Sequence, residues 1–336
     1  MWHYLLLFLL VLIIAFVLYT GYVIWNLNTY KILSFNIEYG AAKYGVDKVV
    51  DIIKNSGADV AILTEVSEID PQYKPIESKN TGKNVASKLG WNCVSVPSND
   101  TVIISKYPLV VQNKDLGSAL VNNKFYIIPV HLPDFPYQPF QVTKIPYCYD
   151  QCQKNVKMDN FGMGVNGVQS HNPDQELKLM SEATKARGSQ MMHIIAEINK
   201  LKSNDNKPII IGGDFNEPSH LDWSLKAFEN NIHPAKVQYP TSSLLYANGF
   251  VDTYRQIYKD EVSEPGYTWP ARMDEVIKDQ FENNVQSSKA KFTNVDQKYI
   301  QDRIDFIYVT QDVLVRNVEK ILTPSDHYAL LASVSM

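Results

Sequence analysis

Residues 208–218, PIIIGGDFNEP, hold the residue types and spacing that best suit chemistry. Three successive isoleucines favour a buried strand, because β-branched side chains suit an extended backbone. The strand runs into Gly212 and Gly213, which can turn where a side chain would clash, and it ends at Asp214 and Asn216. A carboxylate and an amide at the end of a rigid strand can both reach one small anion or water. The alternative is a turn or helix cap in which both bond only to nearby backbone amides.

Other residues of metal-binding or acid-base type also lie where apolar strands end. They are Asn36, Glu65, His131, Asp305, Asp326 and His327. Strands that share one core bring such residues together, so we expect a single site. Carboxylate and amide oxygens without cysteine ligands favour Mg²⁺ or Mn²⁺ over zinc, and the histidines add acid-base groups. A divalent ion, an acid and a base together suit hydrolysis of a phosphoester.

The elements that must position these residues follow from hydrophobic periodicity. Alternating or continuous apolar runs predict strands, and apolar residues at steps of three and four predict helices. The predicted strands cover residues 31–37, 59–63, 92–96, 101–105, 125–130, 209–211, 303–309 and 329–334, and residues 250–252 are expected to return to the core. The predicted helices cover residues 46–55, 83–89, 174–201, 221–228 and 241–247. We find no internal repeat and no domain boundary after residue 30.

The helix over residues 174–201 places Arg187 on its apolar stripe. A guanidinium on that face needs a carboxylate or carbonyl partner, which predicts a structural tie between helix and sheet. His193 lies off the stripe and should be solvated. His220 follows a plausible helix cap and is better explained as a surface residue than as a ligand.

Residues 133–173 form a loop-rich insertion directly after His131, dense in proline, aromatic residues, glycine and asparagine. An irregular stretch of this length inside a compact domain is typical of a functional loop or of disorder. Its aromatic residues either line a substrate pocket, touch a membrane surface or pack the loop on itself. Residues 273–298 are polar and charged, which indicates a surface excursion.

Residues 1–30 contain no Asp, Glu, Lys or Arg, and residues 5–24 are almost wholly apolar. Twenty helical residues span about 30 Å, the thickness of the hydrocarbon core of a bilayer. We therefore expect residues 1–29 to be a single-pass membrane anchor, with a transmembrane helix at about residues 5–25. A cleaved signal peptide is the rival interpretation, but a basic start and a cleavage site are missing. The side of the membrane stays open, and Asn99 is a glycosylation acceptor only outside the cytosol.

Composition narrows the possible classes of function further. The chain has 336 residues, 45% of them hydrophobic, so a large core is available. The formal charge of −4 offers no basic surface of the kind that non-specific nucleic-acid binders carry. A metal ion can supply that positive charge, so a nuclease stays open. Of three cysteines, Cys148 and Cys152 are close enough in the sequence to form one local disulfide in an oxidising compartment. The alternative is that both stay reduced.

The motifs SFNIEYG, ILTEV, PVHL, IIGGDFNEP, GYTWP, RIDFIYV and SDHYALLA occur in this order. Together they resemble the endonuclease/exonuclease/phosphatase superfamily, which includes pancreatic-type deoxyribonucleases, inositol-polyphosphate phosphatases and neutral sphingomyelinases. The resemblance covers residues 30–336. It implies an α/β fold, a four-layer sandwich of two packed mixed β-sheets flanked by helices. It also implies metal-dependent hydrolysis of a phosphoester.

Site roles also follow from the resemblance. It implies that Glu65 holds Mg²⁺, or Mn²⁺ in its place. Asn36 and Asp326 are implied to lie close to the metal or the phosphate. For Arg187 the family pattern allows a structural or a phosphate-proximal role, and we favour the structural one.

The remaining roles concern catalysis. The resemblance implies that Asp214 orients or activates the attacking water, assisted by Asn216. His327, polarised by Asp305, is implied to contact the scissile phosphate. His131 is implied to bind phosphate or to assist as an acid. The tyrosine-bearing motif of abasic-site enzymes is not evident between Ser105 and Phe125, which makes a repair nuclease the weaker interpretation.

We therefore expect a membrane-anchored, Mg²⁺-dependent phosphodiesterase whose substrate is a lipid or another small phosphoester. A metal-dependent nuclease acting on DNA or RNA is the close alternative. From a different class, the chain could be a catalytically inactive binding module tethered to a membrane. No obligate protein partner is inferred.

Overall fold

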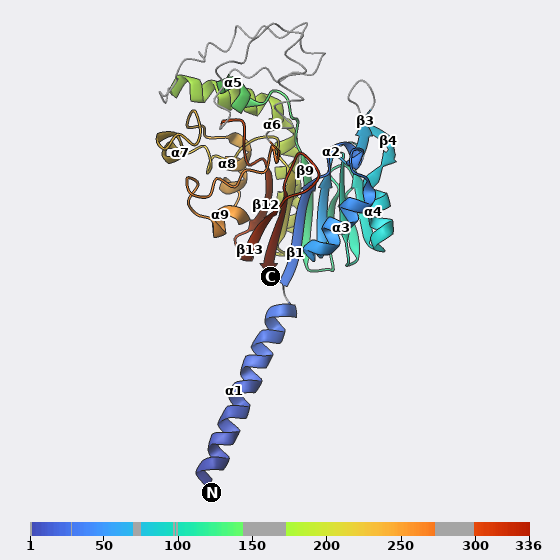
Figure 1. Cartoon of the computed structure of the whole chain (residues 1–336), viewed down its shortest axis with the longest axis vertical. Helices are drawn as coiled ribbons and strands as arrows, with labels where there is room; N and C mark the ends of the chain where they lie inside the picture. Colours follow the sequence, from blue (N-terminus) through green and yellow to red (C-terminus); the bar gives the residue numbers. More distant parts are fainter. Residues whose placement is uncertain are drawn as a thin grey trace.

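The centre of the structure is a pair of six-stranded mixed sheets (Figure 1). The structure is a computed structural model that describes residues 2–27, 29–69, 75–96, 98, 100–143, 173–272 and 299–336. In the first sheet the order is β13-β14-β1-β2-β6-β5, with β1 and β2 parallel and the other neighbours antiparallel. Its strands are β1 (Thr29–Asn36), β2 (Val60–Thr64), β5 (Asn92–Val96), β6 (Thr101–Ser105), β13 (Leu314–Ile321) and β14 (Ala329–Ser335).

The second sheet has the order β11-β12-β10-β9-β8-β7, with β9 and β10 parallel and the other neighbours antiparallel. Its strands are β7 (Leu109–Asn113), β8 (Ser118–Val121), β9 (Phe125–His131), β10 (Ile209–Asp214), β11 (Phe250–Asp252) and β12 (Asp305–Thr310). A separate two-stranded sheet pairs β3 (Ser67–Ile69) with β4 (Pro75–Asn80). The predicted pair of mixed sheets is confirmed.

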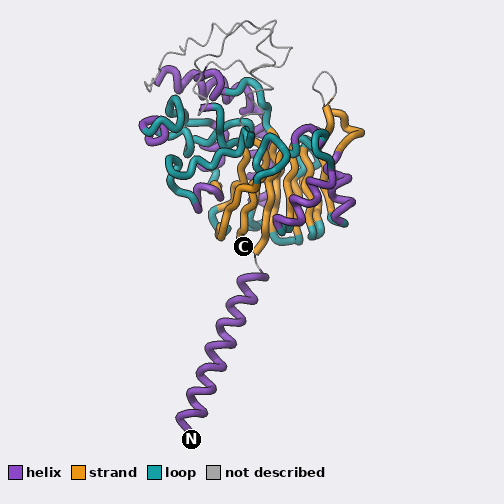
Figure 2. Tube along the Cα trace, in the orientation of Figure 1, coloured by secondary structure: helices purple, strands orange, loops and turns teal. Residues whose placement is uncertain are grey.

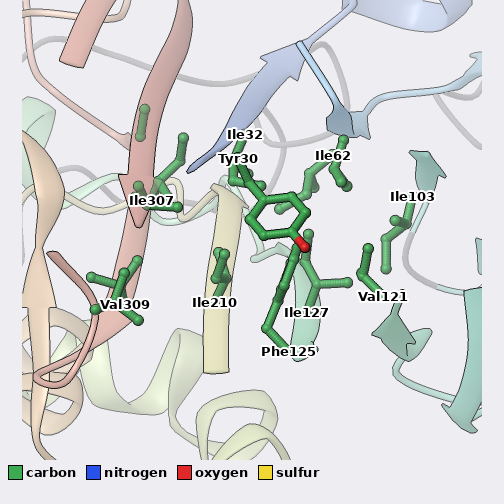
Figure 3. Close-up of a cluster of buried hydrophobic side chains, with 14 of the residues drawn as sticks. Tyr30, Ile32, Ile62, Ile103, Val121, Phe125, Ile127, Ile210, Ile307 and Val309 are labelled. Atoms are coloured by element: carbon green, nitrogen blue, oxygen red, sulfur yellow. The ribbon is translucent and has the colours of Figure 1, made fainter. Parts of the chain in front are cut away.

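Alternate side chains of both sheets meet in one apolar core between them (Figure 3). Ile32 and Ile62 point into it from the first sheet, and Ile127, Ile210 and Ile307 from the second. All five are completely buried. Burying an isoleucine side chain stabilises a fold by about 1.5–3 kcal/mol, so this layer holds the sheets in a fixed relative position.

Helices cover the outer faces of both sheets (Figure 2). On the first sheet, α3 (Val46–Ser56) and α4 (Thr81–Leu89) contribute Val49, Ile53 and Val85 to a second apolar cluster. On the second sheet, α6 (Pro173–Asn204) and α8 (Pro240–Ala247) contribute to a third. The shorter helices are α2 (Glu38–Ala41), α5 (Gln138–Thr143), α7 (Leu225–Glu229) and α9 (Thr253–Ile257). The layers are therefore helix, sheet, sheet and helix.

Helix α1 (Trp2–Leu27) precedes β1 and extends away from the sheets in Figure 1. Phe8, Ile13, Phe16 and its other large apolar side chains that the structure describes are exposed. Within the described residues, no helix has both the length and the apolar character that crossing a membrane requires. The membrane span expected at residues 5–25 is therefore not confirmed.

The glycine pair of β10 does not form the predicted turn, because both glycines lie inside the strand. A Cβ on Gly213 would lie 1.8 Å from the carbonyl oxygen of Val130 on β9. A Cβ on Gly212 would lie 2.8 Å from Cδ1 of Ile62 in the opposite sheet. The glycines are thus needed for close approach of backbone and sheets, and the strand continues straight to Asp214.

The helix predicted over residues 221–228 begins later than expected, at Leu225. Ser224 caps it, accepting a hydrogen bond from the backbone N–H of Ala227 at 3.0 Å, and turns precede it. Strands β3, β4, β7, β8 and β13 were not predicted. Cys148, Cys152, Asn99, most of the insertion and residues 273–298 lie outside the described residues.

Candidate active site

Three site residues stand in one row at the end of the second sheet. Asp214 is the register partner of His131 on β9 and of Asp305 on β12. In the first sheet, Asn36 at the end of β1 pairs with Thr64, and Glu65 follows directly. Because the sheets are packed face to face, both groups meet at the same end of the sandwich.

Asn36 joins the two halves of this group. Its side chain is completely buried, and Nδ2 donates to Oε1 of Glu65 at 2.9 Å and to Oδ2 of Asp214 at 3.0 Å. The same Nδ2 lies 3.3 Å from Nε2 of His327. The Asn36 Oδ1 accepts the backbone N–H of Glu38 at 3.0 Å, which turns the amide nitrogen toward the carboxylates. One amide therefore fixes the separation of two carboxylates from different sheets.

His327 and Asp305 form a buried pair. Nδ1 of His327 lies 2.8 Å from Oδ2 of Asp305, and Nε2 lies 3.8 Å from Oδ2 of Asp214. Burial opposes the charged imidazole, but Asp305, Asp326 and Asp214 outweigh it and hold the pKa of His327 well above its ordinary value. This arrangement keeps Nδ1 on Asp305 and directs Nε2 into the site.

The two carboxylates joined by Asn36 have raised pKa values. Burial and then the charge of Asp305 raise the pKa of Asp214 to about 6. Loss of solvent and then the charge of Asp326 raise the pKa of Glu65 to about 7. Negative charge is therefore crowded in the site, which is the condition that a bound cation relieves.

Asn216 holds the far side of Asp214. Its backbone N–H donates to Oδ1 of Asp214 at 2.8 Å, and its Nδ2 donates to the carbonyl oxygen of Leu132 at 3.0 Å. The backbone of Asn216 has a positive φ of 47°. An asparagine tolerates that conformation better than most residues, and here it closes the loop around the carboxylate.

Two groups of side chains bring ligand atoms within 4.8 Å of one another. One is Glu65, His131 and Asp214, and the other is Asp214, Asp305 and His327. His327 and Asp305 already bond to each other, so the first group fits a cation better. Carboxylate oxygens with one imidazole suit a hard or borderline divalent ion. His131, which we expected to bind phosphate or act as an acid, thus lies with two potential metal ligands.

Asp326 lies at the rim of this group. Its Oδ1 lies 4.0 Å from Nε2 of His327, and its side chain is 31% exposed. Its Oδ2 accepts the indole N–H of Trp269 at 3.1 Å, and its backbone N–H donates to Glu38. Every predicted catalytic and metal residue therefore lies in one contiguous site, while their chemical roles stay predictions.

The comparison with known families decides the assignment. The model of the Endonuclease/Exonuclease/phosphatase family matches residues 33–327. The chain belongs to this family. The match includes the whole site, from Asn36 to His327.

A curated relative is the uncharacterized protein F14F9.5 of Caenorhabditis elegans. It is 26% identical over 343 residues, which cover 90% of this chain and 96% of the relative. Among solved structures, an AP endonuclease from Archaeoglobus fulgidus is 14% identical with a TM-score of 0.49, covering 90% of this chain and 98% of that one. The 3′ phosphatase NExo from Neisseria is 15% identical with a TM-score of 0.49 and the same coverage.

Arg187, the other residue singled out from the family pattern, has hydrogen-bond and ion-pair partners other than the site residues described above. It is completely buried, Nη1 donates to Oε1 of Gln138 at 2.7 Å, and Nη2 donates to the carbonyl oxygen of Pro136 at 3.2 Å. Its Nη1 lies 3.6 Å from Oε2 of Glu217, in the loop after β10. These are the contacts of a residue that ties α6 to the segment after His131 and to the loop after Asp214.

Sequence reasoning missed Glu38, Thr268 and Trp269. Glu38 is buried, forms an ion pair with Lys43 and accepts the backbone N–H of Asp326. Thr268 Oγ1 accepts the backbone N–H of Asp305 at 3.1 Å. The signals were present, because Glu38 belongs to SFNIEYG and the other two to GYTWP. Those motifs supported the family assignment without a role for each residue.

Proposed function

We propose that this member of the Endonuclease/Exonuclease/phosphatase family is a Mg²⁺-dependent hydrolase of phosphodiesters, with Mn²⁺ able to replace Mg²⁺. The observation that carries the proposal is the contact of one amide, Asn36, with carboxylates of both sheets beside the His327–Asp305 pair. A protein that only binds a ligand has no need for a buried imidazole oriented by a carboxylate next to paired acidic groups. The catalytically inactive alternative is therefore the weaker one.

Glu65, Asp214 and His131 are the residues that fit a divalent ion. When bound, the ion neutralises phosphate charge and lowers the pKa of a coordinated water. His327, held through Nδ1 by Asp305, directs its Nε2 N–H at a phosphate oxygen and stabilises the charge that develops there. Asn216 and Asn36 fix the two oxygens of Asp214, so that this carboxylate orients the attacking water beside Glu65 and His131.

We also propose that residues 1–29 attach the catalytic domain to a membrane as a single-pass anchor. The support is the uncharged, apolar sequence of residues 5–24 and the exposure of the apolar side chains of α1. Within the described residues, no helix is long and apolar enough to cross a bilayer, so the anchor is proposed on sequence and exposure alone.

The position of the site bears on the substrate. Strand β1 begins at Thr29, next to α1, and ends at Asn36 in the site. At about 3.3 Å per residue, a strand of this length separates its ends by roughly 25 Å. A site at that distance from α1 favours a phosphoester reached from the aqueous phase over a lipid head group in the same bilayer. A small phosphodiester is thus our first choice, with nucleic acid as the alternative.

A substrate panel tests this function. The full chain and its Glu65→Ala variant are incubated with bis(p-nitrophenyl) phosphate, inositol phosphates, sphingomyelin vesicles, plasmid DNA and RNA, each with Mg²⁺ and with EDTA. We expect turnover of a soluble phosphodiester by the wild-type chain with Mg²⁺ alone. Turnover of sphingomyelin only would overturn the substrate assignment. Undiminished turnover in EDTA or by the variant would overturn the metal-dependent mechanism.

A further inference from the structure

Trp269 links a site carboxylate to the described start of the insertion. Its Nε1 N–H donates to Oδ2 of Asp326 at 3.1 Å. The ring centroid of the same indole lies 5.7 Å from that of Tyr137, edge to face, and 5.8 Å from that of Phe140. Tyr137 and Phe140 are both buried. The indole therefore fills the space between Asp326 and the segment that follows His131.

The backbone around Trp269 is fixed to the Asp326 loop on both sides. The backbone N–H of Ala271 donates to the carbonyl oxygen of Asp326 at 2.7 Å, and that of Tyr328 donates to Thr268 at 2.8 Å. Trp269 itself exchanges backbone hydrogen bonds with Asp302. An indole anchored in this way has one orientation, so its N–H defines where the Asp326 carboxylate can point.

A buried tryptophan often only satisfies its N–H with the nearest acceptor, and Trp223 is such a case. Its Nε1 donates to Oδ1 of Asp302 at 2.8 Å, and both side chains are completely buried. Asp326 differs, because its side chain is 31% exposed and its Oδ1 faces Nε2 of His327 at 4.0 Å. A partly exposed aspartate can rotate away from the site unless a donor holds it.

We propose that Trp269 is a positioning residue for the hydrolysis, acting through Asp326. Trp269 holds Oδ2, while Ser325 Oγ donates to Oδ1 at 3.3 Å, and together they keep Oδ1 directed at His327. The ring contacts make this orientation depend on Tyr137 and Phe140. The inference rests on the proposed function. Partners that orient the carboxylates in and around a metal site typically contribute about 10- to 100-fold in metal affinity or activity.

The test compares two conservative tryptophan variants of the full chain. Trp269→Phe removes the N–H donor and keeps an aromatic ring, and Trp223→Phe makes the same change at a tryptophan outside the site. Mn²⁺ binding is measured by titration calorimetry. The values of kcat and KM are measured by steady-state kinetics with the best phosphoester of the panel. We expect Trp269→Phe to weaken Mn²⁺ binding and lower kcat, each by about 10-fold or more, with KM little changed. Trp223→Phe should leave Mn²⁺ affinity within about twofold.

A double-mutant cycle with Asp326→Asn shows whether Trp269 acts through Asp326. If it does, Trp269→Phe has little further effect on Mn²⁺ affinity or kcat in the Asp326→Asn background, whereas additive effects overturn the proposal. Should Trp269→Phe fail to fold, Phe140→Leu keeps the indole N–H but loosens its packing. A smaller change in the same direction then supports the proposal, and no change overturns it.

The outcomes separate this inference from the proposed function. Mn²⁺ binding that depends on Trp269, without hydrolysis of any phosphoester, overturns the function and leaves intact only the role of Trp269 in orienting Asp326. Hydrolysis by the wild-type chain, with equal Mn²⁺ affinity and equal kcat in both phenylalanine variants, overturns the positioning role alone.

Discussion

Nδ1 of His327 lies 2.8 Å from Oδ2 of Asp305, and this contact orients the imidazole of the site. Asp305 is itself fixed, because it begins β12 beside Asp214 on β10 and its backbone N–H donates to Thr268. Its Oδ1 is buried and has no hydrogen-bond partner among the described residues. A rigid carboxylate behind an imidazole is the arrangement that holds one tautomer and favours the charged ring.

The first prediction concerns this pair. Asp305→Asn removes the negative charge that favours the imidazolium, so we expect kcat to fall by about 100- to 10,000-fold, the range typical of acid-base groups. The measurement is steady-state kinetics with the best phosphoester and Mg²⁺. The matched control is His193→Ala, since His193 is exposed on α6 and should be neutral. An Asp305→Asn variant as active as the wild-type chain contradicts the assigned role.

The second prediction concerns Asn36. Asn36→Ala leaves the carboxylates of Glu65 and Asp214 without their shared donor, and an unsatisfied buried polar group costs about 1–3 kcal/mol. In EDTA, urea unfolding should show a loss of that size. Mg²⁺ should restore part of the stability, because the ion relieves the same repulsion. Asn317→Ala, at an exposed position, serves as control, and equal stability of the two variants argues against the contact.

The third prediction is a pH dependence of stability away from the site. Burial raises the pKa of Asp302 to about 8, from an ordinary value of 3.8. The folded chain thus keeps a proton that the unfolded chain releases, so this group's contribution to stability is lost as pH rises from about 4 to about 8. Urea unfolding between pH 5 and pH 8 should show the wild-type chain losing more stability than Asp302→Asn, which cannot ionise. Equal slopes contradict the assignment.

The fourth prediction concerns a buried ion-pair network beside the second sheet. Arg303 is 1% exposed, and its Nη2 donates to Asp222 at 2.9 Å and to Asp252 at 2.6 Å. Arg303→Met leaves Asp252 buried without this cation and leaves Asp222 with Arg255 alone, which should cost about 3–5 kcal/mol. Arg316→Met, on the edge strand β13, should cost less than about 1 kcal/mol. Thermal unfolding of the two variants distinguishes these values.

The fifth prediction concerns membrane attachment. Arginine near the centre of a membrane-inserted helix costs about 2.5–3.5 kcal/mol per residue, so Leu10→Arg with Ile14→Arg should release the chain from liposomes. The measurement is flotation of the full chain with vesicles. A control with Lys124→Ala, in the loop before β9, should float like the wild-type chain. A wild-type chain that stays at the bottom of the gradient rejects the anchor.

The sequence predicted the elements that carry the site well, because their signals are local. The isoleucines of β10 and the alternation before Asn36 read correctly as strands, and the resemblance to the family implied the two sheets. Strands β7 and β13 were missed because they are short or exposed edge strands without a clean alternation. The glycine pair was misinterpreted as a turn. Gly213 is needed because the backbone of Val130 lies close to it, and Val130 belongs to a different strand.

The site could be predicted as a set of residues but not as a network. Nothing in the sequence shows that the amide of Asn36 bridges Glu65 and Asp214, or that Glu38 bonds to Asp326, since the partners are far apart along the chain. The grouping of His131 with Glu65 and Asp214 also depends on register between β9 and β10. Such relations need three-dimensional packing.

The most direct test of the account is the Mg²⁺-dependent turnover of the best phosphoester by the wild-type chain, Glu65→Ala and His193→Ala, measured side by side. The account predicts full activity for the wild-type chain and for His193→Ala, and no activity in EDTA. Glu65→Ala should lose more activity than the roughly 10- to 100-fold that is typical when a partner of a metal ligand is removed. Undiminished turnover by Glu65→Ala would contradict it.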